Sequence, residues 1–186
     1  MAEQPLSGNL PLSLAPDAGM KSVPVMVHTQ DQLAWGDIQI SENLLVSLVL
    51  QGTEVPDFVS LSDAKIVSVD KGLNGGADSF SELHIPTHTI LGFHLMPPHT
   101  EPPDYDADEP NRKMEPVVAK VGNFIFHGHA RMSTQTNIKS FLEVTRAEFV
   151  SLYDLEIVHR LGGSQPPIKV DTAQIRRLSA AWGSSN

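Results

Sequence analysis

Cysteine is absent from the 186 residues of this chain, which excludes disulfide bonds, thiolate metal sites and a cysteine nucleophile. Aromatic residues make up only 6% of the sequence, so stacking surface for nucleic-acid bases is sparse. No stretch approaches 18 uninterrupted apolar residues, and Met1–Gly19 has neither a basic start nor a long apolar core. We therefore expect a cytoplasmic protein that makes no use of a membrane.

The sequence also lacks the short motifs of common enzymes. The region around Ser60 and Ser151 has no Gly-x-Ser-x-Gly elbow, and the glycines of 72–76 are not arranged as a phosphate or dinucleotide loop. We expect no catalytic activity and no cofactor.

What the chain does contain is an internal match. Residues 58–67 read FVSLSDAKIV and residues 149–158 read FVSLYDLEIV, with seven positions identical in register. Such a repeat indicates a duplicated structural unit of about 70 residues. The match extends outward, pairing Gly36 with Gly128 and Thr87-x-x-Ile90 with Thr172-x-x-Ile175.

The length fits two such units. We predict a flexible N-terminal arm over residues 1–21, a first repeat over 22–96, a linker over 97–115 and a second repeat over 116–183. The linker is acidic and rich in proline, so self-repulsion and ring stiffness should keep it extended.

Each unit is predicted to be mainly β, with a short helical segment. Glycine inside the second strand of each unit, Gly36 or Gly128, indicates a bulge or bend that lets a short sheet curl. The fold class is therefore two tandem small five-stranded barrels of the SH3-like or Sm-like type. The expected strands of the first unit are 23–28, 33–40, 58–69, 83–87 and 90–95, and the expected helical segments are 44–50 and 134–143.

The repeated segments resemble a class of uncharacterised small bacterial β-domains. The resemblance lies in the strand with a central glycine, the leucine-containing segment, the Phe-x-x-Leu-x-Asp strand and the closing strand ending in isoleucine, and it covers about 24–96 and 116–182. It implies a fold and no activity. Similarity to Sm proteins is weaker, because the Asn and Arg-Gly signatures that bind RNA there are missing from both copies.

The two units carry opposite charge. Residues 22–96 contain nine acidic and two basic residues, a net of −7, whereas 117–182 contain eight basic and five acidic residues, a net of +3. Opposite charge favours contact between the units, within one chain or head to tail between chains. The alternative explanation is evolutionary drift in the charge of surface residues exposed to solvent. We expect a protein partner, a homo-oligomer, or both, and no nucleic-acid partner.

Histidine is the one functional residue type that is frequent, with 8 in the chain. His127 and His129 flank Gly128 on a predicted strand, where both imidazoles would lie on one face and could begin a zinc or nickel site. A second group consists of His84, His88, His94 and His99. The first unit has Trp35 and Asp37 in place of His127 and His129, so hydrogen-bonded histidines at strand edges are the competing explanation.

The remaining repeated residues are interpreted as structural. Asp63 and Asp154 are isolated carboxylates without a repeated base, which is a poor catalytic set, and their type suits a bend in the backbone. Phe58 and Phe149 begin the matched strands.

Three hypotheses follow. The first is a non-catalytic interaction or assembly module. The second is a metal-binding or small-ligand-binding regulator using His127 and His129. The third is an Sm-like nucleic-acid binder that works through the second repeat.

Overall fold

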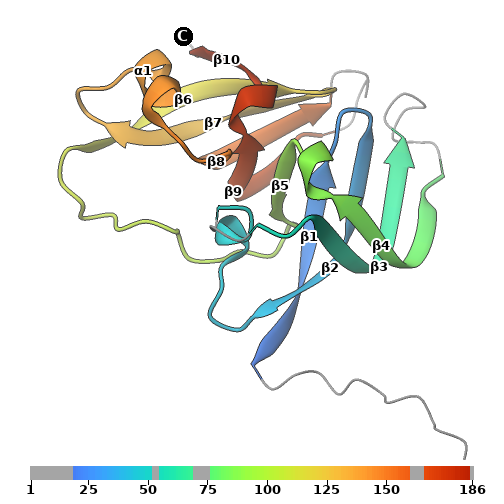
Figure 1. Cartoon of the computed structure of the whole chain (residues 1–186). Coiled ribbons are helices and arrows are strands. Elements are labelled where there is room, and N and C mark those ends of the chain that lie inside the picture. Colours follow the sequence, from blue (N-terminus) through green and yellow to red (C-terminus); the bar gives the residue numbers. More distant parts are fainter. Residues whose placement is uncertain (1–18, 52–54, 69–75, 160–165, 185–186) are drawn as a thin grey trace, which may run out of the picture.

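The computed structural model describes residues 19–51, 55–68, 76–159 and 166–184, and these form one mainly β structure (Figure 1). Ten antiparallel strands make a single sheet in the order β10-β6-β7-β8-β9-β5-β1-β2-β3-β4, accompanied by one α-helix, α1 (Ile138–Val144). The strands are β1 (Met20–His28), β2 (Gln32–Ser41), β3 (Phe58–Ser68), β4 (Asp78–Pro86), β5 (Gly92–Leu95), β6 (Arg112–Val121), β7 (Phe124–Ser133), β8 (Phe149–His159), β9 (Ile168–Arg176) and β10 (Ala181–Ser184).

The strands follow from alternation of buried and exposed residues along the predicted segments. In β2, for example, buried and less buried positions alternate from Ala34 to Ser41, as expected for a strand with one face on a core. The β6–β7 hairpin turns through Gly122, whose φ of +55° is open to glycine at little cost.

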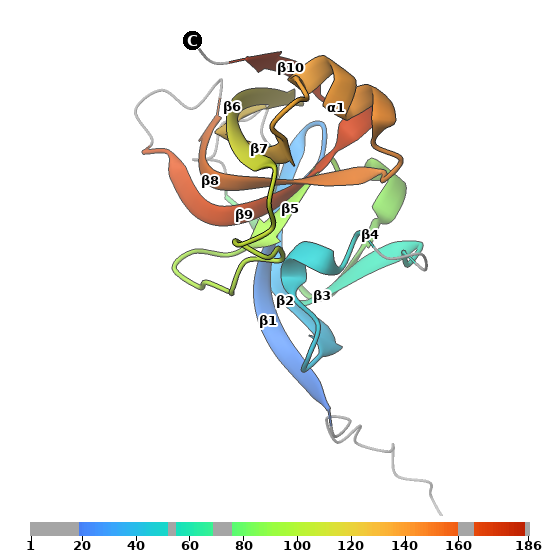
Figure 2. The ribbon, with the colours of Figure 1, turned by 90° about the vertical axis from the view of Figure 1, so that its left-hand side faces the viewer.

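The two halves of the chain have the same sequence of strand neighbours. The last strand of each half, β5 or β10, returns to pair with the first strand of that half, β1 or β6. The sequence predicted two separate barrels, whereas β5 also pairs with β9 and joins everything into one continuous ladder. The ladder stays open among the described residues, with β4 and β10 as its edges. In a second view the halves lie one above the other with β5 and β9 between them (Figure 2).

The two hydrophobic cores exchange residues between the halves. The core of the second half includes Leu33, Val67 and Leu91 from the first half, and the core of the first half includes Phe149 from the second. Neither core is therefore complete without the other half.

The predicted helical segments differ in form. The first contains the 3₁₀ turn η1 (Val46–Leu48), and the second becomes α1, whose N-cap Asn137 accepts a 2.9 Å hydrogen bond from the Ser140 N–H. Such an N-cap stabilises the first turn of a helix. No described helix is long and apolar enough to cross a membrane.

The predicted boundaries shift at both ends of the first unit. Residues 1–18 of the expected arm lie outside the described residues, and β1 already begins at Met20. β6 begins at Arg112, inside the expected linker. The segment before it is not the free, extended spacer that its composition predicted, because it contacts both halves of the protein as described below.

Candidate functional site

The junction between the halves is an edge-to-edge pairing of two strands. β5 and β9 run antiparallel, with Gly92 opposite Ile175, Phe93 opposite Gln174 and His94 opposite Ala173. This is the geometry by which one chain adds a strand to the sheet of another.

Arg176 anchors the junction from the second half. Its buried guanidinium donates hydrogen bonds to two backbone carbonyls of the first half, those of Ile90 at 2.6 Å and of Thr87, and it also pairs with the Glu148 carboxylate. The guanidinium carbon lies 4.5 Å from the centre of the Phe149 ring. A charge this deep is retained because several acceptors and an aromatic face replace its water.

Phe149 lies beneath this arginine and fills the first half's core. Its side chain is fully buried, although it belongs to the second half. Full burial of a phenylalanine contributes about 1.5–3 kcal/mol, so the hydrophobic effect holds the halves together at this point.

A chain of polar contacts crosses the same junction. The Gln51 side-chain amide, from the first half, donates to Ser151 Oγ at 2.7 Å and to Gln174 Oε1 at 2.8 Å. The Gln174 amide in turn donates to Ser151 Oγ at 2.9 Å. Gln174 is wholly buried, and these bonds satisfy it.

The acidic segment between the halves binds them on both sides. Glu101 accepts hydrogen bonds of 2.8 Å from the N–H groups of Val46 and Ser47, which caps η1 of the first half. Asp104 accepts from the hydroxyl groups of Ser151 (2.9 Å) and Tyr153 (2.8 Å) of the second half. The carboxylates that were expected to hold the segment away from the domains instead dock it onto them.

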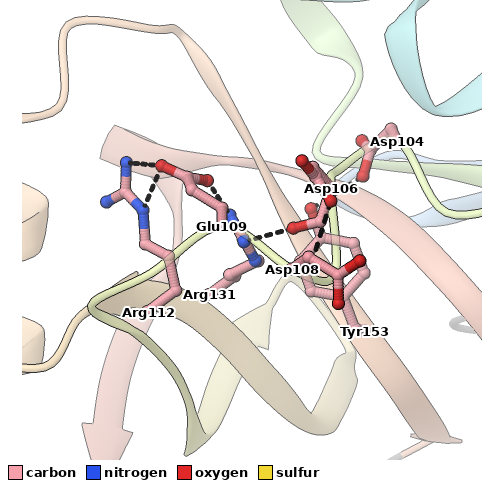
Figure 3. A network of polar contacts seen from close by, with 7 residues as sticks. All are labelled: Asp104, Asp106, Asp108, Glu109, Arg112, Arg131 and Tyr153. Carbon is pink, nitrogen blue, oxygen red and sulfur yellow. Dashed lines mark hydrogen bonds and ion pairs between the residues drawn. The ribbon is translucent and has the colours of Figure 1, made fainter.

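Farther along this segment, Glu109 lies between two arginines (Figure 3). Arg131 donates to Glu109 Oε2 at 2.6 Å, and Arg112 donates to Glu109 Oε1 at 2.8 Å. The hydrogen bonds from Arg112 and then Arg131 lower the pKa of Glu109 to about 2. Arg131 also covers the Tyr105 ring, 4.7 Å from its centre. In this ion-pair network both oxygens of the Glu109 carboxylate are occupied by arginine donors.

Two buried histidines form the most unusual titratable pair. His94 Nδ1 donates to the Leu95 carbonyl at 2.8 Å, so its Nε2 accepts from His28 Nε2–H at 2.9 Å. His28 also packs edge-on against Phe124 and Phe126 of the second half. Burial and then the neighbouring His94 lower the pKa of His28, and burial lowers the pKa of His94 to about 4. Both imidazoles are therefore neutral near pH 7, and among the residues that the structure describes no carboxylate pairs with them.

The predicted glycines and aspartates meet in two equivalent bulges. Register shifts between Trp35 and Asp37 on β2, so Gly36 faces the pair Asp63 and Ala64 on β3. Asp63 has φ of +47°. A Cβ on Gly36 would lie 2.8 Å from the Ser62 carbonyl oxygen. The glycine therefore leaves room for the bulge, and the aspartate takes its left-handed position, which Asp tolerates better than most residues.

The second half repeats this arrangement. Register shifts between His127 and His129, Asp154 has φ of +50°, and a Cβ on Gly128 would lie 2.9 Å from the Tyr153 carbonyl oxygen. His127 and His129 flank this bulge, with His127 exposed and His129 partly buried. In the described part of the chain no three His, Cys, Asp or Glu side chains gather as a metal site.

The other predicted histidines are dispersed. His84 Nδ1 lies 2.8 Å from Ser60 Oγ on the exposed edge, His99 Nδ1 lies 3.1 Å from the Met96 carbonyl, and His88 is exposed in the turn η3 (Thr87–Thr89). Only His94 of this group meets another histidine.

The open edges expose apolar residues that the junction buries elsewhere. Phe58, at the start of β3 beside edge strand β4, is 53% exposed. At the other edge α1 has no buried residue, and Val144 at its end is 69% exposed. Uncovered apolar groups beside an unpaired strand are typical of an interaction surface.

Sequence reasoning missed the residues of the junction. In the sequence Arg176 is one of the eight basic residues of 117–182, and His28 is the last residue of the predicted strand 23–28. Their partners, the Ile90 carbonyl and the Phe124 ring, are distant in sequence, so no local spacing indicates them. Arg176 ends a strand that also contains Lys169, Asp171 and Gln174, so its local sequence does not indicate a buried guanidinium.

Comparison with protein-family models, with curated proteins and with solved structures finds no match to this chain.

Proposed function

We propose that the protein is a non-catalytic assembly module, made of two duplicated small β-units, that recognises other chains through its sheet edges. The observation that carries the proposal is the junction itself, where the chain joins its own halves by pairing β5 with β9 and leaves one edge of β4 and one edge of β10 without a neighbour in the described ladder.

The equivalent bulges support the duplication. Gly36 with Asp63 and Gly128 with Asp154 occupy the same places in their halves. Return of β5 to β1 and of β10 to β6 supports the view that each unit is a small, incompletely closed barrel of the SH3-like type.

The chemistry of the interior supports a non-catalytic role. The Glu109 carboxylate is occupied by Arg112 and Arg131, and the His28–His94 pair is enclosed by side chains. A catalytic acid or base must instead reach a reacting group within hydrogen-bond distance.

The test uses one position on the β4 edge. The Thr87 N–H donates to the Asp57 carbonyl on the β3 side. Donor directions alternate along an antiparallel strand, so the N–H of His84 faces the open edge. His84→Pro removes this donor without removing a β3–β4 bond, and His84→Thr is the matched control that keeps it.

Full-length protein is used to capture binding proteins from native cytosol, and its own mass is followed by sedimentation. We expect association, with itself or with another protein, that His84→Pro abolishes and His84→Thr preserves. Association that is insensitive to His84→Pro, or no association in either assay, would contradict edge recognition.

A further inference from the structure

The β5–β9 junction is built from three parts, and each has a counterpart at the open edges. The first part is the ladder. β10 occupies in the second half the place of β5 in the first, and β4 occupies the place of β9. The two strands with an open edge are thus the counterparts of the two strands that pair with each other in the middle of the sheet.

The second part is the short helical element. η1 packs on both β5 and β9 and buries Val46. Its counterpart α1 follows β7 as η1 follows β2, yet none of its residues is buried. Ile138 and Phe141 of α1 pack against the core of the second half but stay partly exposed, whereas Val46 of η1 is buried at the junction.

The third part is the phenylalanine that begins the matched strands. Phe149 lies opposite Arg176 of β9 and is fully buried at the junction, whereas Phe58 lies opposite Pro86 of β4 and is 53% exposed. Phe58 and Phe149 occupy equivalent positions but differ in burial. The difference arises because β9 has β5 as a neighbour and the β4 edge has none in the described ladder.

We infer that the missing neighbour is a second copy of this chain, whose β10 pairs antiparallel with β4 of the first, an inference that rests on the proposed edge recognition. The junction supplies the register. In the junction Phe93 lies opposite Gln174, and the counterparts of these residues are Trp182 on β10 and His84 on β4. Trp182 of one copy therefore lies opposite His84 of the other. The next hydrogen-bonded pair along the strands is Ser184 opposite Glu82. The contact is head to tail, so it continues from chain to chain until a ring closes or a filament grows.

Charge favours this occupant. β4 carries Asp78 and Glu82 without a basic residue. On β6, Lys120 lies opposite Ala181 of β10, and Arg177 lies four residues before the start of β10, in η4 (Arg177–Ser179). Opposite charges at the two edges steer copies together and make the contact weaken as salt is raised.

One junction element has no counterpart. Proline stands at position 86, where the equivalent strand of the second half has the anchoring Arg176. The pairing between copies therefore lacks two hydrogen bonds to backbone carbonyls, and it should be weaker than the internal junction and reversible on dilution.

Cysteine pairing tests the register in a chain that has no cysteine of its own. Two full-length variants, Glu82→Cys and Ser184→Cys, change exposed side chains only. In a hydrogen-bonded antiparallel pair the Cα atoms lie about 5.5 Å apart, within disulfide range. Mixing the variants under mild oxidation should give a species of twice the 20.2 kDa chain mass.

The matched control moves one cysteine by a single residue, to the exposed Ser81. Because side chains alternate across a sheet, Ser81→Cys presents its thiol on the opposite face. It should cross-link to Ser184→Cys at least tenfold less. His84→Pro added to Glu82→Cys should abolish the cross-link, and His84→Thr should keep it.

Two outcomes separate this inference from the proposed function. If the chain sediments as a monomer at micromolar concentration and Glu82→Cys does not cross-link to Ser184→Cys, the second copy is excluded. If a different protein is then captured in a manner that His84→Pro alone abolishes, edge recognition stands and only the identity of the partner was wrong. A monomer that captures nothing overturns both. Equal cross-linking from Ser81→Cys and Glu82→Cys would overturn the register and the inference with it.

Discussion

The buried pair of His28 and His94 should make the protein less stable in mild acid. Burial holds the pKa of His94 at about 4 in the folded chain, whereas an unfolded histidine titrates near 6.5. The unfolded state therefore binds the proton first. Stability is fully present above about pH 7 and falls as the pH drops below about 6.5.

The size of the effect follows from the two pKa values of His94. A shift of one pKa unit corresponds to about 1.4 kcal/mol, so between pH 7.5 and pH 5 His94 alone should lower the free energy of unfolding by about 2 kcal/mol. The lowered pKa values of His28 and His159 act in the same direction. The Glu109 pKa falls from an ordinary value of 4.5 to about 2 on folding, so its contribution to stability is lost mainly below this window.

Urea denaturation at pH 7.5, 6.5, 5.5 and 5 measures the loss. We expect His94→Asn, which keeps a donor for the Leu95 carbonyl, to reduce the loss by about 2 kcal/mol, while the exposed His88→Asn leaves it in place. Equal free energies of unfolding at pH 7.5 and pH 5 in the native chain would refute the reasoning, as would an unchanged loss in His94→Asn.

Three further predictions concern the bulges and the junction. Gly36→Val and Gly128→Val should each destabilise the protein by about 1–3 kcal/mol in thermal or urea melts, because the added carbon meets backbone atoms; an unchanged melt would remove the packing explanation. Asp63→Ala and Asp154→Ala should each cost about 1 kcal/mol through their positive φ, and the Asn variants much less, so equal melts for Ala and Asn would contradict this cause. Arg176→Met should leave first-half carbonyls unpaired and cost about 1–3 kcal/mol, with faster hydrogen exchange of the β5 amides than in the native chain; unaltered exchange would show that the arginine does not hold the junction.

Much of the secondary structure could be predicted from the sequence, because strand residues alternate locally. The predicted strands 23–28 and 33–40 lie within β1 and β2, and 58–69 covers β3. The turn η1 also lies inside the predicted segment 44–50, and α1 overlaps the predicted segment 134–143 and ends one residue beyond it. In each case the evidence is contained within about ten residues of sequence.

The pairing of β5 with β9 could not be predicted in this way, because it joins residues about 80 positions apart. A short sequence match was even misleading here. Thr172-x-x-Ile175 was matched to Thr87-x-x-Ile90, but the ladders place Ile175 opposite Val150 and Ile85 opposite Val59. Ile175 therefore corresponds to Ile85, which shows that position in a ladder decides equivalence more reliably than four letters of sequence.

The linker was misjudged for a different reason. Its acidic residues were treated as mutually repelling charges in water, but Glu101 and Asp104 each find hydrogen-bond donors on a different half of the protein. Composition gives the charge of a segment and not the donors that it meets after folding.

The placement of Phe149 in the first half's core also constrains how the chain folds during synthesis. When β5 has been translated, the first half has all its strands but lacks this buried ring, which lies 54 positions beyond Leu95. At 5–20 residues per second, the ribosome takes roughly 3–11 s to reach it. During that interval the nascent first half has an open hydrophobic site, and β5 lacks its neighbour β9. A chaperone or a neighbouring nascent chain can bind in this state. Completion of the first half is thereby tied to synthesis of the second.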